Sequence, residues 1–396
     1  MNILSSLVTV SAIMLAAATA SAQVQNFAPL HQFSTATDGA RPQGAVLRDS
    51  AGNLYGTTSA GGGAGEGVVY KIDAQGNETV LFSFSAFDSG ADPASALIQD
   101  QAGNLYGIAD EGPGGAGVIY KLSADGKQTL LHSFEGGFNL NPKVPTGGIL
   151  MDKLGNIFGT TLFGGDGSCD FGCGTLFRLD TAGKLHVLHK FAGAEGTQPF
   201  GPLIQDSDGN LYGVSRSGGD LSCVDPQFSN SGCGTVFKLS KDNTLTVLHT
   251  FHGGRDGSSP QPGLLMDVLG NLYGTTFQGG KSENGLIFRI STKGRYTVLH
   301  RFSQKEARNP NGGLVADLAG NLYGTAQLGG GHDLGSTFRL SPTGELTVLH
   351  SFKGLDDGAV PFAGLVPDDT GHFFGTAFKN FLIQPVQGGN VFEIRP

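Results

Sequence analysis

Short runs in which apolar and polar residues alternate follow one another along almost the whole chain, separated by turns rich in Gly, Asp and Asn. Alternation with a period of two residues predicts short strands. In one stretch of about forty residues the runs are 313–317, 321–325, 336–340 and 346–352. The connection between the first two runs and the connection between the last two runs are short enough to form hairpins. We label the four predicted strands a, b, c and d in chain order.

The sequence Gly-Asn-Leu-Tyr-Gly, with its variants GNIFG and GHFFG, marks strand b in every repeat. The seven copies begin at Gly52, Gly103, Gly155, Gly209, Gly270, Gly320 and Gly371. Successive copies are 50 to 61 residues apart. A repeat of this length with four short strands is typical of the blades of a β-propeller.

The repeat is incomplete at both ends of the chain, and the two deficits match. A d-type strand at Leu30–Phe33 opens the chain without a preceding a, b or c. The last repeat supplies a, b and c at 365–368, 373–376 and 391–394 but no d. Pairing the two ends closes the ring and removes its exposed edges. We therefore predict an all-β fold, a single seven-bladed β-propeller of four-stranded blades over residues 23–396.

The first 22 residues have the pattern of a signal peptide. An apolar run from Ile3 to Ala18 ends in Ala20-Ser21-Ala22, the small-x-small pattern accepted by signal peptidase. An uncleaved anchor is the alternative. No later stretch reaches 18 uninterrupted apolar residues, so we expect no other membrane span. The predicted location is secreted or periplasmic.

Composition and charge limit the classes of partner that this protein is expected to bind. The 396 residues include 65 glycines and 15% charged residues, and the formal net charge is −9. No run of Lys or Arg could neutralise successive phosphates, so we expect no binding to nucleic acid. A protein, a polysaccharide or a small molecule remain as partners, and we expect a monomer.

The segment D-x-x-G-N-L-Y-G-T-T, present as Asp49–Thr58, resembles the repeat of the bacterial GloVer proteins, also called choice-of-anchor tandem repeat proteins. The resemblance extends over essentially the whole mature chain. It implies an exported or surface protein with a C-terminal sorting anchor. Only Arg395 and Pro396 follow the last predicted strand, so we expect no such anchor here.

Two sets of repeated polar side chains are interpreted as structural. An Asp closes strand a in all seven repeats, at Asp49, Asp100, Asp152, Asp206, Asp267, Asp317 and Asp368. Its side chain is suited to accept backbone hydrogen bonds in an Asx-turn. A His occupies one position of strand d at His31, His132, His189, His249, His300 and His350. Phe82 replaces it in the remaining copy, which indicates a packing position.

The four cysteines form two equivalent pairs in neighbouring repeats. The segments around Cys169 and Cys173 match those around Cys223 and Cys233. Matched positions predict matched pairing, and we expect the disulfides Cys169–Cys173 and Cys223–Cys233. A four-cysteine zinc site is the alternative, although the spacing lacks the C-x2-C element of such sites.

The b–c and d–a connections are longer than the hairpins and must share one face of the ring, which is where binding residues are expected. The residue after the repeated Pro supplies the candidates Gln43, Phe200, Gln261, Asn311 and Phe362 at the central mouth. Positions that break the repeat after strand b supply the candidates Asp110, Glu111, Arg216, Lys281 and His332, expected further out.

These features favour a non-catalytic binding or scaffold protein of the bacterial cell envelope that acts through the loop face. The alternative is an extracellular glycan hydrolase or lyase with its site on the same face. Such an enzyme needs a converging acid and base, and strand a, which should line the channel, carries no charge in any repeat apart from Arg48 and the turn Asp. No cofactor is expected. Calcium is the alternative interpretation of five carboxylates near the d–a prolines, Asp38, Glu195, Asp256, Glu306 and Asp357, which turn formation explains more simply.

Overall fold

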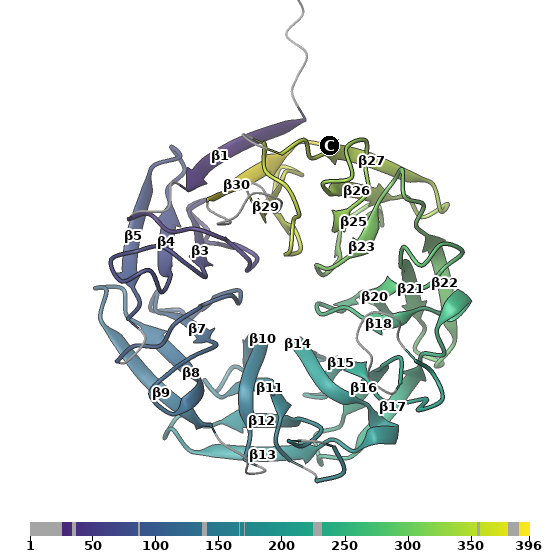
Figure 1. Cartoon of the computed structure of the whole chain (residues 1–396), viewed down its shortest axis with the longest axis horizontal. Helices are drawn as coiled ribbons and strands as arrows, with labels where there is room; N and C mark the ends of the chain where they lie inside the picture. Colours follow the sequence, from purple (N-terminus) through teal and green to yellow (C-terminus); the bar gives the residue numbers. More distant parts are fainter. Residues whose placement is uncertain are drawn as a thin grey trace, which may run out of the picture.

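The structure is a computed structural model, and it describes residues 26–33, 37–85, 88–136, 141–165, 167–169, 171–224, 232–354, 357–378 and 388–396. The predicted signal peptide, residues 1–22, lies outside the described residues. Figure 1 shows seven separate sheets arranged as a closed ring around one axis. The fold is a seven-bladed β-propeller, as the repeat predicts. None of the helices in the described part of the chain is long and apolar enough to span a membrane.

Each blade is an antiparallel sheet, and in blades 1 to 6 the strands follow chain order from the axis outward. Blade 1 contains β2 (Leu47–Arg48), β3 (Leu54–Thr58), β4 (Val68–Ile72) and β5 (Glu78–Ser83). Blade 2 contains β6 (Ile98–Gln99), β7 (Leu105–Ala109), β8 (Gly115–Leu122) and β9 (Gln128–Glu135). Blade 3 contains β10 (Lys143–Met151), β11 (Ile157–Phe163), β12 (Thr175–Leu179) and β13 (Leu185–Lys190). Blade 4 contains β14 (Thr197–Gln205), β15 (Leu211–Ser217), β16 (Thr235–Leu239) and β17 (Leu245–Thr250).

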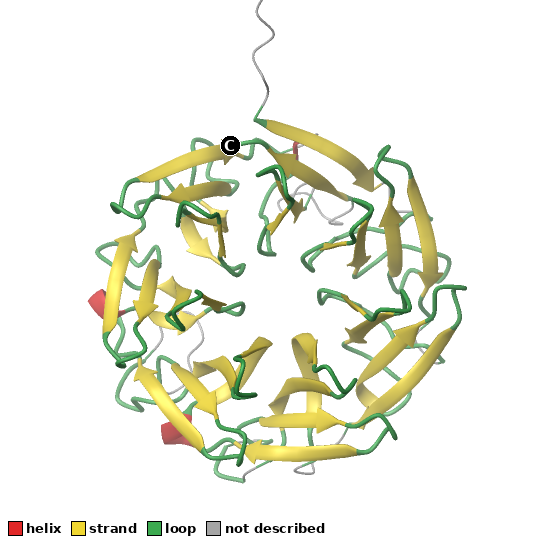
Figure 2. Ribbon diagram, turned by 180° about the vertical axis from the view of Figure 1, so that it is seen from behind, coloured by secondary structure: helices red, strands yellow, loops and turns green. Residues whose placement is uncertain are grey.

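In blades 5 and 6 the innermost strand is divided into two short segments that pair with the same neighbour. Blade 5 contains β18 (Ser258–Pro260), β19 (Leu265–Met266), β20 (Leu272–Gln278), β21 (Leu286–Ile290) and β22 (Tyr296–Arg301). Blade 6 contains β23 (Arg308–Pro310), β24 (Val315–Ala316), β25 (Leu322–Leu328), β26 (Ser336–Leu340) and β27 (Leu346–Ser351). Figure 2 shows two short helical turns outside the sheets, η1 (Gly193–Glu195) and η2 (Gly254–Asp256), in the connections that follow blades 3 and 4.

The two ends of the chain complete blade 7 together. It contains β28 (Val366–Pro367), β29 (Phe373–Ala377), β30 (Gly389–Ile394) and β1 (Phe27–Phe33). β1 pairs antiparallel with β30, with Phe27 opposite Ile394 and Phe33 opposite Gly389. The predicted closure of the ring is therefore confirmed, and the N-terminal strand is three residues longer than the sequence pattern indicated.

Aromatic side chains join each blade to the next. A Phe at the end of strand d packs edge-on against an aromatic ring on strand c of the following blade, with ring centroids 4.9 to 5.6 Å apart. The seven pairs are Phe33–Tyr70, Phe84–Tyr120, Phe134–Phe177, Phe191–Phe237, Phe251–Phe288, Phe302–Phe338 and Phe352–Phe392. The core is thus a ring of equivalent contacts between blades, and edge-to-face pairs are a favourable aromatic geometry.

The same aromatic ring explains the second Gly of the strand-b motif. A Cβ atom added at this Gly would lie within 2.7 Å of the aromatic side chain on strand c in all seven blades. The positions are Gly56, Gly107, Gly159, Gly213, Gly274, Gly324 and Gly375. Because real Cβ atoms do not approach other atoms so closely, any side chain here must displace the blade's central aromatic residue.

The repeated Asp organises the a–b hairpin, as its Asx-turn interpretation predicts. In blade 4, Oδ1 of Asp206 accepts backbone N–H bonds from Asp208 and Asn210 at 3.0 and 2.9 Å. Oδ2 accepts the side-chain amide of Asn210 at 2.7 Å and the hydroxyl of Tyr212 at 2.9 Å. The two backbone bonds recur in all seven hairpins. Hydrogen bonds to an ionised carboxylate favour its charged form.

We expect Asp206→Asn to reduce stability at neutral pH and to flatten the acid limb of the stability profile. Burial opposes the ionised form of Asp206, but bonds from Asn210, Tyr212 and Asp208 outweigh it and lower the folded pKa below 3.8. Stability from this group is therefore present above the unfolded pKa and is lost as the pH falls through the folded pKa. Urea unfolding between pH 2 and 7 measures both effects. The control is Asp208→Asn in the same turn, which is exposed. Equal profiles for the two variants would contradict the prediction.

The five carboxylates considered for calcium lie beside the repeated histidines instead. Nε2 of the His and a carboxylate oxygen are 2.9 to 3.6 Å apart in every pair. The pairs are His31–Asp38, His189–Glu195, His249–Asp256, His300–Glu306 and His350–Asp357. Four of the carboxylates also accept backbone N–H bonds from the start of their own turn. Within the described ranges, no group of three or more His, Cys, Asp and Glu side chains is arranged to hold a metal ion.

Candidate functional site

A cavity of about 470 Å³ lies on the ring axis, at the inner ends of the blades. All seven blades contribute to its lining, mainly through the loop that enters strand a and the first residues of that strand. Most of the wall is Gly, Ala and Pro. The aromatic, amide and carboxylate side chains of the lining come from Gln43, Asp110, Phe200, Asn311 and Phe362. The cavity is of the size that binding sites for small ligands have.

A repeated backbone conformation turns the chain toward this cavity. The residue before each d–a proline is not a Gly, yet its φ lies between 50 and 62° in all seven repeats. These residues are Arg41, Asp92, Val144, Gln198, Ser259, Asn309 and Val360. The left-handed region is uncommon for such residues, and a following Pro narrows their choice further. The residue after this Pro lines the cavity in five of the seven repeats, at Gln43, Ala94, Phe200, Asn311 and Phe362.

Two amide side chains at the rim are anchored by the protein. Nε2 of Gln43 donates to Oγ of Ser59 at 2.8 Å, and the Ser59 hydroxyl lies near enough to Asp92 to favour the ionised form of its carboxyl group. Nδ2 of Asn311 donates to the carbonyl oxygen of Phe362 in the next blade at 3.1 Å. Each amide therefore has a fixed orientation and keeps its oxygen and one N–H for a ligand.

Asp110 is the ionisable residue of the lining that the structure describes. It follows strand β7 directly, at the position that holds Ser59 in blade 1 and Arg216 in blade 4. Burial raises the pKa of Asp110 to about 7, and the nearby carboxylates of Asp92 and Glu111 add to this effect. Asp110 was expected further out than the rim, but it lies in the cavity lining together with the rim residues.

Asp92, which sequence reasoning did not select, lies beside Asp110. Burial raises its pKa, while Arg41 and the Ser59 hydroxyl favour its ionised form. Its Oδ1 atom is buried and accepts no hydrogen bond. The sequence signal was available, because Asp92 stands before the repeated Pro in the one blade where that residue is acidic.

The remaining predicted residues do not line the cavity. Gln261 is 1% exposed, and its Nε2 folds back to donate to the Ser259 carbonyl at 2.8 Å. Arg216 lies within β15, where its guanidinium carbon is 4.7 Å from the centroid of the Phe200 ring. Glu111, Lys281 and His332 are exposed on the outer loops. The cavity therefore unites Asp110 with four of the five rim candidates.

Both disulfides of the b–c loops are present with the expected pairing, Cys169–Cys173 and Cys223–Cys233. This contradicts the alternative of a four-cysteine zinc site, because all four sulfur atoms are bonded to each other in pairs. Cys173 and Cys233 are fully buried. Two disulfides fit an oxidising extracellular or periplasmic environment.

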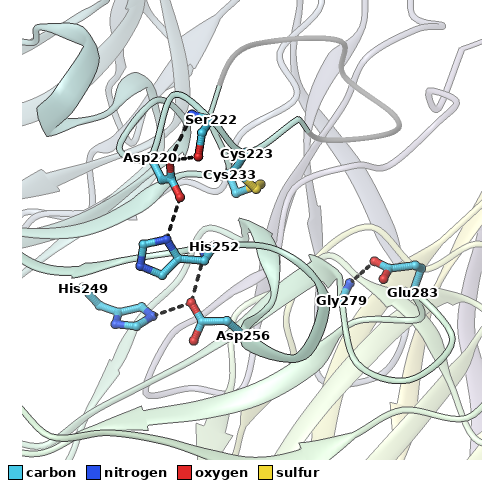
Figure 3. Close-up of a disulfide and its surroundings, with 9 residues drawn as sticks. All are labelled: Asp220, Ser222, Cys223, Cys233, His249, His252, Asp256, Gly279 and Glu283. Atoms are coloured by element: carbon cyan, nitrogen blue, oxygen red, sulfur yellow. Dashed lines mark hydrogen bonds and ion pairs between the residues drawn. A yellow bond between two sulfur atoms is a disulfide. The ribbon is translucent and has the colours of Figure 1, made fainter.

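The polar side chains beside the Cys223–Cys233 bridge do not form a catalytic triad. In Figure 3 the carboxylate of Asp220 lies between Oγ of Ser222 at 2.6 Å and Nδ1 of His252 at 2.7 Å. A nucleophilic Ser requires the His to be in the middle, where it can take the hydroxyl proton. Here the aspartate holds the Ser hydroxyl, so this cluster orders the loop.

Comparison with known families decides the classification. The sequence matches the Gloeobacter/Verrucomicrobia repeat over residues 18–226 and 223–396. The chain belongs to this family. The resemblance drawn from the D-x-x-G-N-L-Y-G-T-T segment is thereby confirmed. Members of the Gloeobacter/Verrucomicrobia repeat family are thus expected to share the blade described above, since the matched regions include every strand of the ring.

Solved structures share the propeller fold of this Gloeobacter/Verrucomicrobia repeat protein at low sequence identity. The extracellular domain of a one-component system from B. thetaiotaomicron has a TM-score of 0.55 and 14% identity, over 93% of this chain and 41% of that chain. The chain therefore spans about two fifths of that protein's length.

Two further structures match at lower scores. A gluconolactonase from Xanthomonas campestris (TM-score 0.45, 13% identity, 93% of this chain and 97% of that chain) and a luciferin-regenerating enzyme (TM-score 0.45, 15% identity, 93% and 95%) carry no functional argument at these scores. A search of the curated proteins finds no match.

Proposed function

We propose that this protein is a secreted, non-catalytic binding module of the bacterial cell envelope, and that its ligand occupies the axial cavity. The observation that supports the proposal is the cavity itself, about 470 Å³ in volume and lined by two aromatic rings, two anchored amides and one carboxylate. An apolar pocket with a few fixed polar groups is the usual form of a recognition site for a small molecule or a polymer end. The rigid ring holds these groups in place before the ligand arrives, which lowers the entropic cost of binding.

The alternative is an extracellular enzyme that uses Asp110 as an acid. A carboxyl group whose pKa is about 7 is suited to proton transfer near neutral pH. Glycoside hydrolysis requires a second carboxyl group across the scissile bond. Among the described residues of the lining, Asp110 is the one carboxylate, so binding is the better-supported function.

We expect Ala94→Phe to abolish ligand binding without unfolding the protein. Ala94 lines the cavity at the position that holds Phe200 in blade 4 and Phe362 in blade 7, so the blade accommodates a Phe here while the added ring fills the site. A thermal-shift screen of small molecules and a glycan array, each run on wild-type protein and on this variant, measure the loss. The control is Lys281→Ala, which is exposed and distant from the lining.

Two results would contradict the proposal. Ligands that bind the Ala94→Phe variant as tightly as the wild type would place recognition outside the cavity. Turnover of a glycan by purified protein that disappears in Asp110→Asn would establish the enzymatic alternative.

A further inference from the structure

We propose that the ligand of the axial cavity carries a primary ammonium group that binds the carboxylate of Asp110. This inference rests on the proposed function and specifies the chemical class of its ligand. It combines the cavity, the charges around Asp110 and the absence of a hydrogen bond to the Asp110 carboxylate among the described residues.

The charges around Asp110 are mostly negative. Glu111 adjoins it in the chain, and Asp92 approaches it from the d–a loop of the same blade. Arg41 favours the ionised form of Asp92, whereas the charged groups that act on the pKa of Asp110 are Asp92 and Glu111. Arg216, the cation at the equivalent position two blades away, lies on the Phe200 ring. The side of the cavity at blade 2 is therefore a site of negative potential that a bound cation would relieve.

On this side of the cavity, carboxylate oxygens are left without a hydrogen-bond donor from the protein. No hydrogen bond to the carboxylate of Asp110 occurs among the described residues, and the buried Oδ1 of Asp92 accepts none. One N–H of Gln43 is already used, because it donates to the Ser59 hydroxyl. An ammonium group supplies three N–H donors and no acceptor, which suits the carboxylate of Asp110, while Asp92 lies outside the lining and contributes negative charge only. A carboxylate or phosphate ligand would meet repulsion here.

The rest of the lining suits an apolar body attached to the ammonium group. Phe200 and Phe362 present aromatic surface, and the Ala, Pro and Leu residues of strand a complete the wall. A ligand with one charged end and a ring or short alkyl chain would place the charge on Asp110 and the apolar part against these residues. Burial of that part adds to the affinity in proportion to its area.

Three probes of nearly equal shape test the charge of the ligand. Benzylamine is a cation, benzyl alcohol is neutral and benzoate is an anion. Isothermal titration of the full mature chain at pH 8 should show binding of benzylamine at least tenfold tighter than that of the other two. Asp110→Asn should lower the benzylamine affinity about tenfold and leave benzyl alcohol unchanged. Asp208→Asn, a charge change in an exposed hairpin turn outside the lining, should leave all three unchanged.

The pH dependence provides a second readout that a structural role of Asp110 would not produce. Because burial holds the pKa of Asp110 at about 7, the benzylamine affinity of the wild type should rise between pH 6 and 8 as the carboxylate ionises. Benzylamine itself stays protonated over this range. The Asp110→Asn variant should show a flat profile.

The outcomes separate this inference from the proposed function. The inference is overturned if benzylamine does not bind, or if benzyl alcohol or benzoate binds as tightly as benzylamine. If other ligands bind the wild-type protein and Ala94→Phe abolishes their binding, the proposed function stands although the inference of an ammonium group fails. When no ligand is sensitive to Ala94→Phe, the proposed function itself fails.

Discussion

A chain that lacks residues 27–33 should lose the cooperative unfolding transition of the full-length protein and aggregate. β1 is the outer strand of blade 7, and its removal leaves β30 as an open edge. It also removes Phe33, which is 2% exposed and packs on Tyr70 of blade 1. Deleting a single buried Phe side chain typically costs about 3 to 5 kcal/mol. Loss of the whole strand should therefore consume most of a stability of about 5 to 15 kcal/mol.

Thermal unfolding followed by circular dichroism, together with size-exclusion chromatography, measures this loss. A synthetic peptide of residues 26–33 added in trans should restore the transition, because it can pair with β30 by strand addition. A peptide of the same composition in scrambled order is the control. An unchanged melting temperature for the truncated chain would show that the ring does not depend on its seam.

Gly324→Ala should destabilise the protein by roughly 1 to 3 kcal/mol, the usual cost of overpacking a core. The added Cβ would lie 2.7 Å from Cζ of Phe338 and 3.0 Å from Cδ2 of Leu314. The same substitution where space is free should not destabilise, since Ala restricts the unfolded chain more than Gly does. Gly63→Ala provides this control, because nothing lies within 4 Å of its added Cβ and its φ is not positive. Urea unfolding measures both variants.

A double substitution identifies the cause of the effect. Phe338→Leu alone removes part of the core and should also destabilise. Combined with Gly324→Ala, it should cost less than the sum of the two single variants, because the atoms that clash are those of the Phe338 ring. Additive costs would mean that the Gly is required for a reason other than this contact.

The candidate site was predictable from the sequence as a face of the ring and as a position in the repeat. The residue after the d–a Pro lines the cavity in blades 1, 2, 4, 6 and 7, and the same backbone turn precedes it in all seven blades. Gln261 occupies the same position, but its side chain donates a hydrogen bond to its own loop. Nothing in the repeat pattern predicts this difference in side-chain orientation. The inward position of Asp110 and the proximity of Asp92 depend on where β7 ends relative to the neighbouring loop.

The repeated histidines show the same division between what the sequence predicts and what only the structure reveals. Their repetition, with one Phe substitution, was enough to indicate packing, and each of the six lies edge-on to the Phe two residues later. That five of them would also pair with the carboxylates of the following turn was not evident, because the two sets are six or seven residues apart along a chain that reverses direction between them.

The sequence by itself determined the strand pattern, the sevenfold repeat, the seam at β1 and β30, and the pairing of the cysteines. Each of these follows from local periodicity or from comparing one repeat with the next, and a closed ring is the arrangement that leaves no strand edge unpaired. Only the tertiary structure decided which rim residues share the axial cavity and which carboxylates lie together. Positions that are equivalent in the repeat acquire different neighbours from adjacent blades and loops, and those neighbours set burial, hydrogen bonding and pKa.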